Sequence, residues 1–294
     1  MNRQELHADP LLAASGAALQ DLPAQALYIV ATPIGNLADI TLRALWVLSC
    51  VDAIAAEDTR TTGALLRRYG IDTPVRAVHE HNERAAASAI IGQLNAGGRV
   101  ALVTDAGTPA ISDPGARLVR AVIEAGRRVV PVPGASSLTA AASAAGLRSE
   151  RITFAGFLPA GSRERARLLR ELAARGEAFV LFEAPHRIEA TSRELASILD
   201  GGRRVVVARE LTKKFETVQA CQARDLGNAI GPEPRGEFVV LVDAPDADPG
   251  DVDAVTRRWL EALAEALPPS RAAAVAARAT GLSRERLYPL LARE

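Results

Sequence analysis

The chain has 294 residues, enough for one or two domains with a sizeable core, and its 48% apolar and 24% charged residues are typical of globular proteins. The 35 basic residues balance 35 acidic ones, which excludes an overall electrostatic attraction to nucleic acid and leaves only local basic patches. The two cysteines show no CxxC or Cys/His spacing, and no apolar run reaches about 18 residues, so neither a metal site nor a membrane span is predicted.

The first 25 residues lack the basic region and long apolar stretch of an export signal. We therefore expect a disordered, frayed tail at residues 1–25 and a cytoplasmic protein. From residue 26, short β-rich runs alternate with amphipathic stretches. Helices are expected at 41–51 and 116–126, and strands at 26–33, 53–56, 99–107 and 128–134.

The second half repeats this alternation, with a helix expected at 187–199 and an Arg-rich helix before the strand at 178–185. Apolar strands separated by helices predict an α/β fold with a largely parallel, buried sheet. The runs FVLFE and RVVVARE could form a second sheet, which would give two lobes at 26–133 and 134–245. The remaining strands of this half are expected at 154–157, 203–212 and 237–245.

Residues 252–294 follow a Pro/Asp-rich linker and show the pattern of three helices. Gly281 at a turn and Ser283 at a helix start give helix-turn-helix spacing. Seven Arg against six acidic residues in 251–294 leave two interpretations open. The segment is either a nucleic-acid contact element or a small helical appendage that packs on the core or on a partner subunit.

Polar and Gly/Pro-rich loops follow most of the predicted strands, and ligands of open α/β sheets bind at this edge. Gly107 and Pro109 keep one loop bare and pre-bent, so that its backbone can approach a ligand closely. No P-loop motif and no GxGxxG motif is present, which favours a nucleoside-type cofactor bound by backbone groups. The loops lie at 31–41, 55–62, 79–83, 104–115, 131–141 and 182–187.

The runs TPIGNL, AEDTR, HNE, VTDAGTPAISDPG, VPGASS, FEAPHR, ARELTK and GEFVVLV resemble the ribosomal RNA methyltransferase branch of the tetrapyrrole-methylase superfamily. The resemblance spans roughly residues 26–243, and the C-terminal helices also look like that branch. It implies a homodimer of two-lobed α/β subunits that bind S-adenosylmethionine between the lobes. It further implies 2′-O-methylation of a cytidine in the decoding region of 16S rRNA. TPIGNL and AGTP replace the glycine-richer turns of tetrapyrrole methylases, which favours the RNA branch.

The resemblance also implies the residues that contact the cofactor. Methyl transfer from a sulfonium is an in-line displacement that needs no metal, and alignment of the reactants is its main requirement. Asp105 is assigned to this group and is also a candidate base. The other expected contacts are Pro33, Gly107, Thr108, Ile111, Ser136 and Ser137, with Ala184 and Leu211 from the second lobe.

A ribose hydroxyl is a weak acid, so a base or a charge-stabilising group would assist the transfer. Asp105 could instead cap its own turn, Glu57 could pair with Arg60, and His79 and His81 could face solvent. His186 is expected to orient a loop or RNA. We expect the acceptor side of the site to be formed by Glu57, Asp58, Arg60, His81, Asn82 and Glu83.

Cations are needed to bind RNA phosphates. The alternative for the Arg-rich helix is a solvated face with Glu164 and Glu171 as partners. Few aromatic residues are available for base stacking, which favours a structured ribosomal substrate recognised largely by its shape. A small surface that recognises shape and must find one nucleotide favours the assembled 30S subunit over free rRNA. Two other functions stay open: a small-molecule tetrapyrrole methylase, and a non-catalytic helix-turn-helix binder. The candidate RNA-binding cations are Arg163, Arg165, Arg167, Arg170, Arg175, Lys213 and Lys214.

Overall fold

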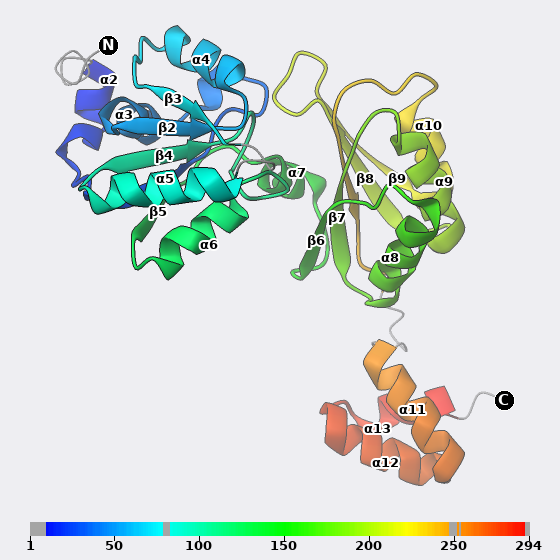
Figure 1. The fold of residues 1–294 in the computed structure, drawn as a ribbon. Coiled ribbons are helices and arrows are strands. Elements are labelled where there is room, and N and C mark those ends of the chain that lie inside the picture. The colour runs from blue at the N-terminus through cyan, green and yellow to red at the C-terminus, as the bar shows by residue number, and fades with distance from the viewer. Residues whose placement is uncertain (1–9, 79–82, 247–251, 253, 292–294) are drawn as a thin grey trace. The chain divides into compact units, whose positions relative to one another are not determined.

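The computed structural model describes residues 10–78, 83–246, 252 and 254–291. Its contacts divide the chain into two compact units (Figure 1). The first unit comprises Met1–Ala144 and Arg209–Thr217, and the second comprises Ala145–Ala208 and Val218–Glu294. The first unit thus extends past the boundary expected near residue 134, and it includes a segment, 209–217, that was expected in the second lobe.

The first unit is built on a five-stranded sheet in the order β3-β2-β4-β1-β5. β1 pairs in parallel with β4 and β5, and β2 pairs in parallel with β3 and β4. Four of the strands confirm the prediction, whereas the three-residue β3 is too short to show a hydrophobic period. The strands are β1 (Ala26–Val30), β2 (Ala53–Ala56), β3 (Val75–Ala77), β4 (Arg99–Val103) and β5 (Arg128–Val132).

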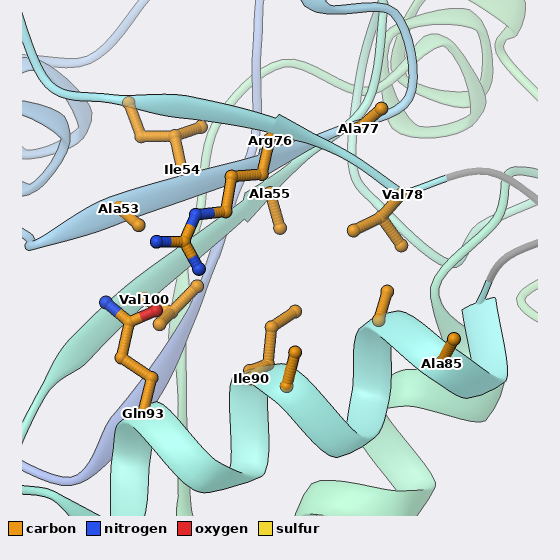
Figure 2. Close-up of a pocket in the computed structure, with 12 residues that line it drawn as sticks. Ala53, Ile54, Ala55, Arg76, Ala77, Val78, Ala85, Ile90, Gln93 and Val100 are labelled. Atoms are coloured by element: carbon orange, nitrogen blue, oxygen red, sulfur yellow. The ribbon is translucent and has the colours of Figure 1, made fainter.

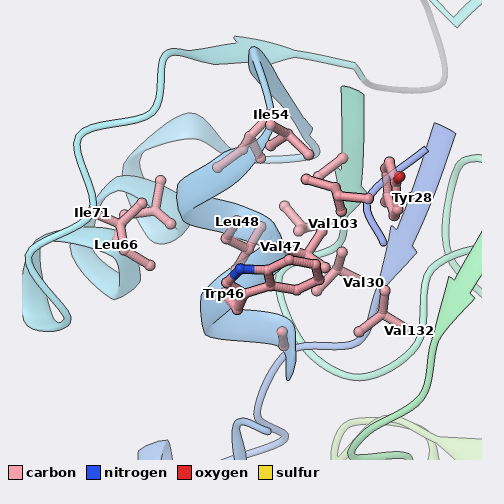
Figure 3. Close-up of a cluster of buried hydrophobic side chains, with 14 of the residues drawn as sticks. Tyr28, Val30, Trp46, Val47, Leu48, Ile54, Leu66, Ile71, Val103 and Val132 are labelled. Atoms are coloured by element: carbon pink, nitrogen blue, oxygen red, sulfur yellow. The ribbon is translucent and has the colours of Figure 1, made fainter. Parts of the chain in front are cut away.

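Strict alternation of side chains gives this sheet two apolar faces. Tyr28, Val30 and Val103 belong to the core on the face of α3 (Leu42–Cys50) and α4 (Thr59–Arg68), which also contains Trp46 (Figure 3). The opposite face carries Leu27, Val100 and Leu102. Leu94 and Leu118 cover it from α5 (Glu83–Asn95) and α6 (Ala116–Glu124).

The expectation of a frayed tail over residues 1–25 is wrong for the part that the structure describes. Leu12, Ala17 and Leu22 are buried in the same core as Trp46. Leu12 lies in α2 (Pro10–Ala14), and Ala17 begins the short 3₁₀ helix η1. The sequence does not predict this packing, because the three buried positions are too widely spaced to produce a periodic apolar pattern.

The second unit contains a mixed sheet in the order β6-β7-β10-β8-β9. β6 is parallel to β7, but β10 is antiparallel to β7, so the expectation of largely parallel strands holds only for the first unit. Helices α8 (Ser162–Ala174), α9 (Ile188–Ile198) and α10 (Leu226–Ile230) contribute Leu169, Leu195 and Leu226 to its core. The strands are β6 (Ile152–Phe157), β7 (Ala178–Glu183), β8 (Arg204–Arg209), β9 (Thr217–Gln222) and β10 (Phe238–Val242).

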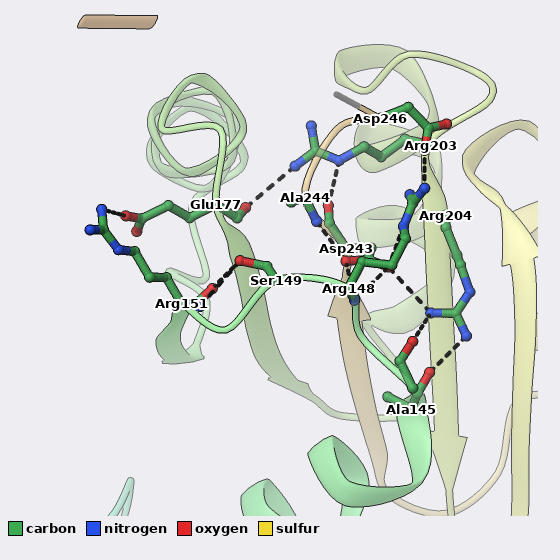
Figure 4. Close-up of polar contacts among 11 residues, drawn as sticks. Ala145, Arg148, Ser149, Arg151, Glu177, Arg203, Arg204, Asp243, Ala244 and Asp246 are labelled. Carbon is green, nitrogen blue, oxygen red and sulfur yellow. Dashed lines mark hydrogen bonds and ion pairs between the residues drawn. The ribbon is translucent and has the colours of Figure 1, made fainter. Parts of the chain in front are cut away.

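The buried carboxylate of Asp243 contacts the chain segment that precedes the first strand of this second sheet (Figure 4). Its Oδ1 accepts from the backbone N–H of Arg148 at 3.1 Å, and its Oδ2 lies 3.4 Å from Arg204 Nη1. Arg204 Nη2 in turn donates to the carbonyl of Ala145 at 2.7 Å, at the end of α7 (Ser137–Ala145). Asp243 therefore ties the segment that leaves α7 to β8 and to the end of β10.

The C-terminal segment forms three helices, α11 (Ala254–Ala266), α12 (Pro269–Thr280) and α13 (Arg284–Leu291). Leu260, Ala273 and Leu287 form part of their own small core. Gly281 ends α12 in the left-handed region, at φ 73°, and Ser283 Oγ accepts from the Arg286 N–H at 3.3 Å, which confirms the expected turn and cap. In the part of the chain that the structure describes, no helix is long and apolar enough to cross a membrane.

Gly115, which precedes α6, is predicted to be intolerant of a side chain. Its φ is +124°, and an added Cβ would lie 2.8 Å from Leu102 Cδ2 in the core. We expect Gly115→Ala to lower the free energy of unfolding by roughly 1–3 kcal/mol in urea titrations. The control is Gly92→Ala, in the exposed middle of α5 with no neighbouring atom within 4 Å, which should raise it by about 0.5–1 kcal/mol. Equal effects of the two variants would contradict this account.

Candidate active site

The first sheet contains a topological switch point between β1 and β4. These strands are neighbours, yet the chain leaves β1 toward β2 on one side and leaves β4 toward β5 on the other. The helices that follow, α3 and α6, pack on opposite faces of the sheet, so the loops 31–41 and 104–115 leave its carboxyl edge toward opposite faces. Ligands of open α/β sheets bind at this position.

A short antiparallel bridge joins the two diverging loops. The Thr32 N–H donates to Gly107 O at 2.9 Å, and the Gly107 N–H donates to Thr32 O at 3.1 Å. The Thr32 hydroxyl also donates to Thr104 O at 3.1 Å. Gly107 has φ +82°, a backbone conformation that favours glycine, although a Cβ there would make only an ordinary contact with Ile34 Cγ2 at 3.4 Å.

Thr32 and Thr104 are buried, and neither was predicted from the sequence as a site residue. Their positions in the sequence were the available signal. Thr104 directly follows the buried strand β4, and Thr32 is the second residue after the buried strand β1. Pro33, an expected cofactor contact, follows Thr32 and is buried beside the bridge.

The loop after β4 has an unusual backbone. Ala110 and Ser112 have φ values of +67° and +64°, a region that non-glycine residues rarely occupy and that clusters at ligand sites. Between them, Ile111 is 41% exposed. The Thr108 hydroxyl donates to Ala135 O at 3.3 Å, which links this loop to the one after β5. The loop after β5 carries two more of the expected cofactor contacts, Ser136 and Ser137, both half-buried at the start of α7.

Two residues of the loop after β2 contact the loop after β4. The Thr104 hydroxyl donates to Glu57 Oε2 at 2.9 Å, and Asp105 Oδ1 accepts from the Asp58 N–H at 3.1 Å. Desolvation by the surrounding loops raises the pKa of Asp105, and the charges of Glu57 and Asp58 raise it further. Asp105 thus accepts a hydrogen bond from the loop after β2. The alternative that we predicted from the sequence was that Asp105 caps its own turn.

Asp58 begins α4 and holds Arg60. Its Oδ1 accepts from the Arg60 backbone N–H at 2.7 Å and from Arg60 Nε at 3.2 Å, and its Oδ2 accepts from Nη2 at 2.7 Å. These bonds lower the pKa of Asp58 to about 2. Arg60 therefore pairs with Asp58, whereas the alternative considered above paired it with Glu57.

Glu83 is buried at the start of α5. Its Oε1 accepts from the backbone N–H groups of Arg117 and Leu118 at 3.1 and 3.0 Å. Gly115, the N-cap of α6, has no side chain to satisfy these groups, so Glu83 provides the cap from another helix. The other expected residues of this loop, His79, His81 and Asn82, lie outside the described residues.

In the second unit, Ala184 and His186 follow β7, the first half-buried and the second exposed. The adjacent Glu183 is fully buried and was not singled out from the sequence. Its Oε2 accepts from Thr191 Oγ1 at 2.6 Å, and its Oε1 lies 3.2 Å from Arg187 Nε. Glu183 therefore fixes the loop that carries Ala184 and His186.

The expected cofactor contact Leu211 is buried, and it belongs to the segment 209–217 that packs with the first unit.

The Arg-rich helix α8 does not present all its cations to solvent. Arg165 is buried and forms two hydrogen bonds with Glu194, at 2.9 and 2.6 Å, so its expected role in RNA binding is wrong. Arg163, Arg167 and Arg170 are exposed, and their spacing places them on one stripe of the helix. Arg175 is also exposed, at the end of α8.

A separate cavity of about 210 Å³ lies between the first sheet and α5 (Figure 2). Alanines such as Ala53, Ala55 and Ala89 line it, and only Arg76 and Gln93 add polar groups. It therefore lacks the convergent polar groups found at the switch point, and we do not assign the reaction to it.

Comparison with known proteins places this geometry in a family. Residues 26–227 match the model of the Tetrapyrrole (Corrin/Porphyrin) Methylases, and residues 246–293 match that of the RsmI C-terminal HTH domain. A solved cobalt precorrin-4 methyltransferase has a similar fold, with a TM-score of 0.57 and 20% identity, over 74% of this chain and 95% of that chain. The family model thus places the chain among the tetrapyrrole methylases, and the solved structure shows the same fold.

Proteins named ribosomal RNA small subunit methyltransferase I are much more similar in sequence. The one from Escherichia coli O157:H7 is 45% identical, over 89% of this chain and 93% of that protein. The one from Neisseria meningitidis serogroup B is 47% identical, over 90% of this chain and 92% of that protein. The chain belongs to the ribosomal RNA small subunit methyltransferase I family, and it is a methyltransferase.

The raised pKa of Asp105 predicts a pH-dependent cost to stability. Since the folded state disfavours the ionised carboxylate, stability falls as the pH rises above the unfolded pKa of about 3.9. Asp105→Asn removes this charge and keeps an oxygen for the Asp58 N–H. We expect the variant to melt at a higher temperature than the parent protein at pH 7, with the difference shrinking below about pH 4. A lower melting temperature at pH 7 would contradict the assignment.

Proposed function

We propose that the protein transfers a methyl group from S-adenosylmethionine to the ribose 2′-hydroxyl of a cytidine in the decoding region of 16S rRNA. The observation that carries the proposal is the 45% identity, over 89% of the chain, to a ribosomal RNA small subunit methyltransferase I. The loops at the switch point support the proposal. They combine residues in the left-handed backbone region with carboxylates and hydroxyls at one edge of the first sheet.

These loops suit a nucleoside-type cofactor. Gly107 gives the loop after β4 a backbone conformation, at φ +82°, that other residues rarely adopt, and Thr108 holds the loops after β4 and β5 together. Ser136 and Ser137 add hydroxyls at the start of α7. S-adenosylmethionine supplies an activated methyl group when it is bound. We assign its binding to the predicted contacts Pro33, Asp105, Gly107, Thr108, Ile111, Ser136, Ser137, Ala184 and Leu211.

Among the described carboxylates, Asp105 is the best candidate to accept the proton of the ribose hydroxyl. Its side chain is exposed, and its pKa is raised toward the working range of a general base. Asp58 is a weaker base because its pKa is about 2, and its two oxygens are used by Arg60. One oxygen of Glu57 accepts from Thr104.

We assign the acceptor side of the site to Glu57, Asp58 and Arg60, together with His81 and Asn82. Arg60 is exposed while it is held by Asp58, so it can contact a phosphate without losing this support. Glu83 acts as a positioning residue in this assignment, because its carboxylate caps α6.

The exposed arginines of α8 are the proposed phosphate contacts of the second unit. The helix-turn-helix segment is a second candidate for RNA contact. We further propose that the enzyme acts in the cytoplasm, as a homodimer, on the assembled 30S subunit. A tetrapyrrole acceptor is the alternative, since the solved structures of similar fold include tetrapyrrole methylases, but their identity of 20% supports only the fold.

The direct test is transfer of label from radioactive S-adenosylmethionine to undermethylated 30S subunits, followed by nuclease digestion. We expect the label in 2′-O-methylcytidine. We also expect Asp105→Asn to reduce the transfer rate by about 100-fold or more, because a general base contributes about 10²–10⁴-fold. Label in another nucleoside, or none despite binding of the cofactor, would contradict the proposed substrate.

Salt dependence tests the role of α8. The double variant Arg163→Gln/Arg170→Gln should bind 30S subunits more weakly, and its slope of log K against log salt should fall by about 1.4–1.8 for two lost phosphate contacts. Arg120→Gln, on the exposed surface of α6, is the control and should leave the slope unchanged. If the double variant keeps the parent slope, α8 does not contact the phosphates.

A further inference from the structure

The segment Arg209–Thr217 connects β8 to β9 and packs with the first unit. Its contact there is the loop after β1, which begins at the switch point. The Asn36 N–H donates to Thr212 Oγ1 at 3.1 Å. The segment is thus attached to a loop of the candidate active site.

Several local features fix the shape of this segment. Glu210 and Thr212 have φ values of +51° and +66°, which non-glycine residues rarely adopt. Lys213 Nζ lies 2.9 Å from Glu210 Oε1, and the Thr212 N–H donates to a carboxylate oxygen of Glu216. At Gly35 an added Cβ would lie 2.5 Å from Lys213 Cγ, so the close contact requires glycine.

The fixed segment presents an aromatic ring to solvent. Phe215 is 70% exposed, and Lys214 Nζ lies 5.5 Å from the centre of its ring. The hydrophobic effect disfavours such exposure. An aromatic ring beside a cation is the combination that proteins use to bind unpaired bases and their phosphates. The low aromatic content of the chain makes this ring a rare stacking surface.

We propose that Phe215 stacks on an unpaired rRNA base close to the methylated nucleotide, while Lys214 contacts the adjacent phosphate. Thr212 and Gly35 act as positioning residues, because they hold the segment against the loop after β1. This inference rests on the proposed function, since it requires an RNA substrate. It adds a residue that selects the substrate and takes no part in the chemistry of transfer.

The kinetic test compares Phe215→Leu and Phe215→Trp on 30S subunits. Loss of the ring in Phe215→Leu should raise KM for the subunits by roughly 10-fold, since stacking on one base contributes about that factor. kcat and the affinity for S-adenosylmethionine should stay unchanged, and Phe215→Trp should retain the parent KM. The control is Ile123→Ala, which removes an exposed apolar side chain of α6. An unchanged KM in Phe215→Leu overturns the proposal, as does a change in oligomeric state that accounts for the loss.

A positioning variant and a binding assay complete the test. Thr212→Val removes the acceptor of the Asn36 N–H, and it should raise KM by itself but add little to Phe215→Leu. In Phe215→Trp, binding of 30S subunits should quench fluorescence beyond the level seen with the parent protein, which already contains Trp46 and Trp259. No additional quenching overturns the stacking proposal. The quenching does not require turnover, whereas transfer by the parent protein tests the proposed function separately.

Discussion

The bridge between Thr32 and Gly107 is the interaction on which the candidate site depends. β1 and β4 are neighbours, and the helices that follow them, α3 and α6, lie on opposite faces of the sheet, so their loops would separate without a link. Two backbone hydrogen bonds, at 2.9 and 3.1 Å, hold them together. The buried hydroxyl of Thr32 adds a bond to Thr104, whose own hydroxyl reaches Glu57. One small group of contacts therefore positions the loops after β1, β2 and β4.

Carboxylates in this chain divide into those with a structural role and those available for chemistry. Glu83 and Glu183 are buried carboxylates that hold a helix start and a loop. Asp58 is used to hold Arg60, whereas Asp105 keeps a raised pKa and an exposed side chain. The buried or paired carboxylates thus have structural roles, whereas the exposed Asp105, with its raised pKa, is suited to chemistry.

The sequence was sufficient to predict four of the five strands of the first unit, because they are apolar runs of a buried parallel sheet, whereas the three-residue β3 was too short to recognise. It also placed the polar loops at one edge, since parallel strands bring their carboxyl ends together. It could not reveal long-range pairings such as the cap that Glu83 provides to Arg117 and Leu118. Arg165 shows the same limit: a basic run looks exposed until its buried partner, Glu194, is known.

The most direct test of the central claim is a crystal structure of the protein bound to S-adenosylhomocysteine, the demethylated product of the cofactor. The account predicts density for the ligand at the carboxyl edge of the first sheet, against Gly107, Thr108 and the start of α7, with the Thr32–Gly107 bridge intact. Density elsewhere, for example in the alanine-lined cavity beneath α5, would contradict the assignment of the switch point as the active site.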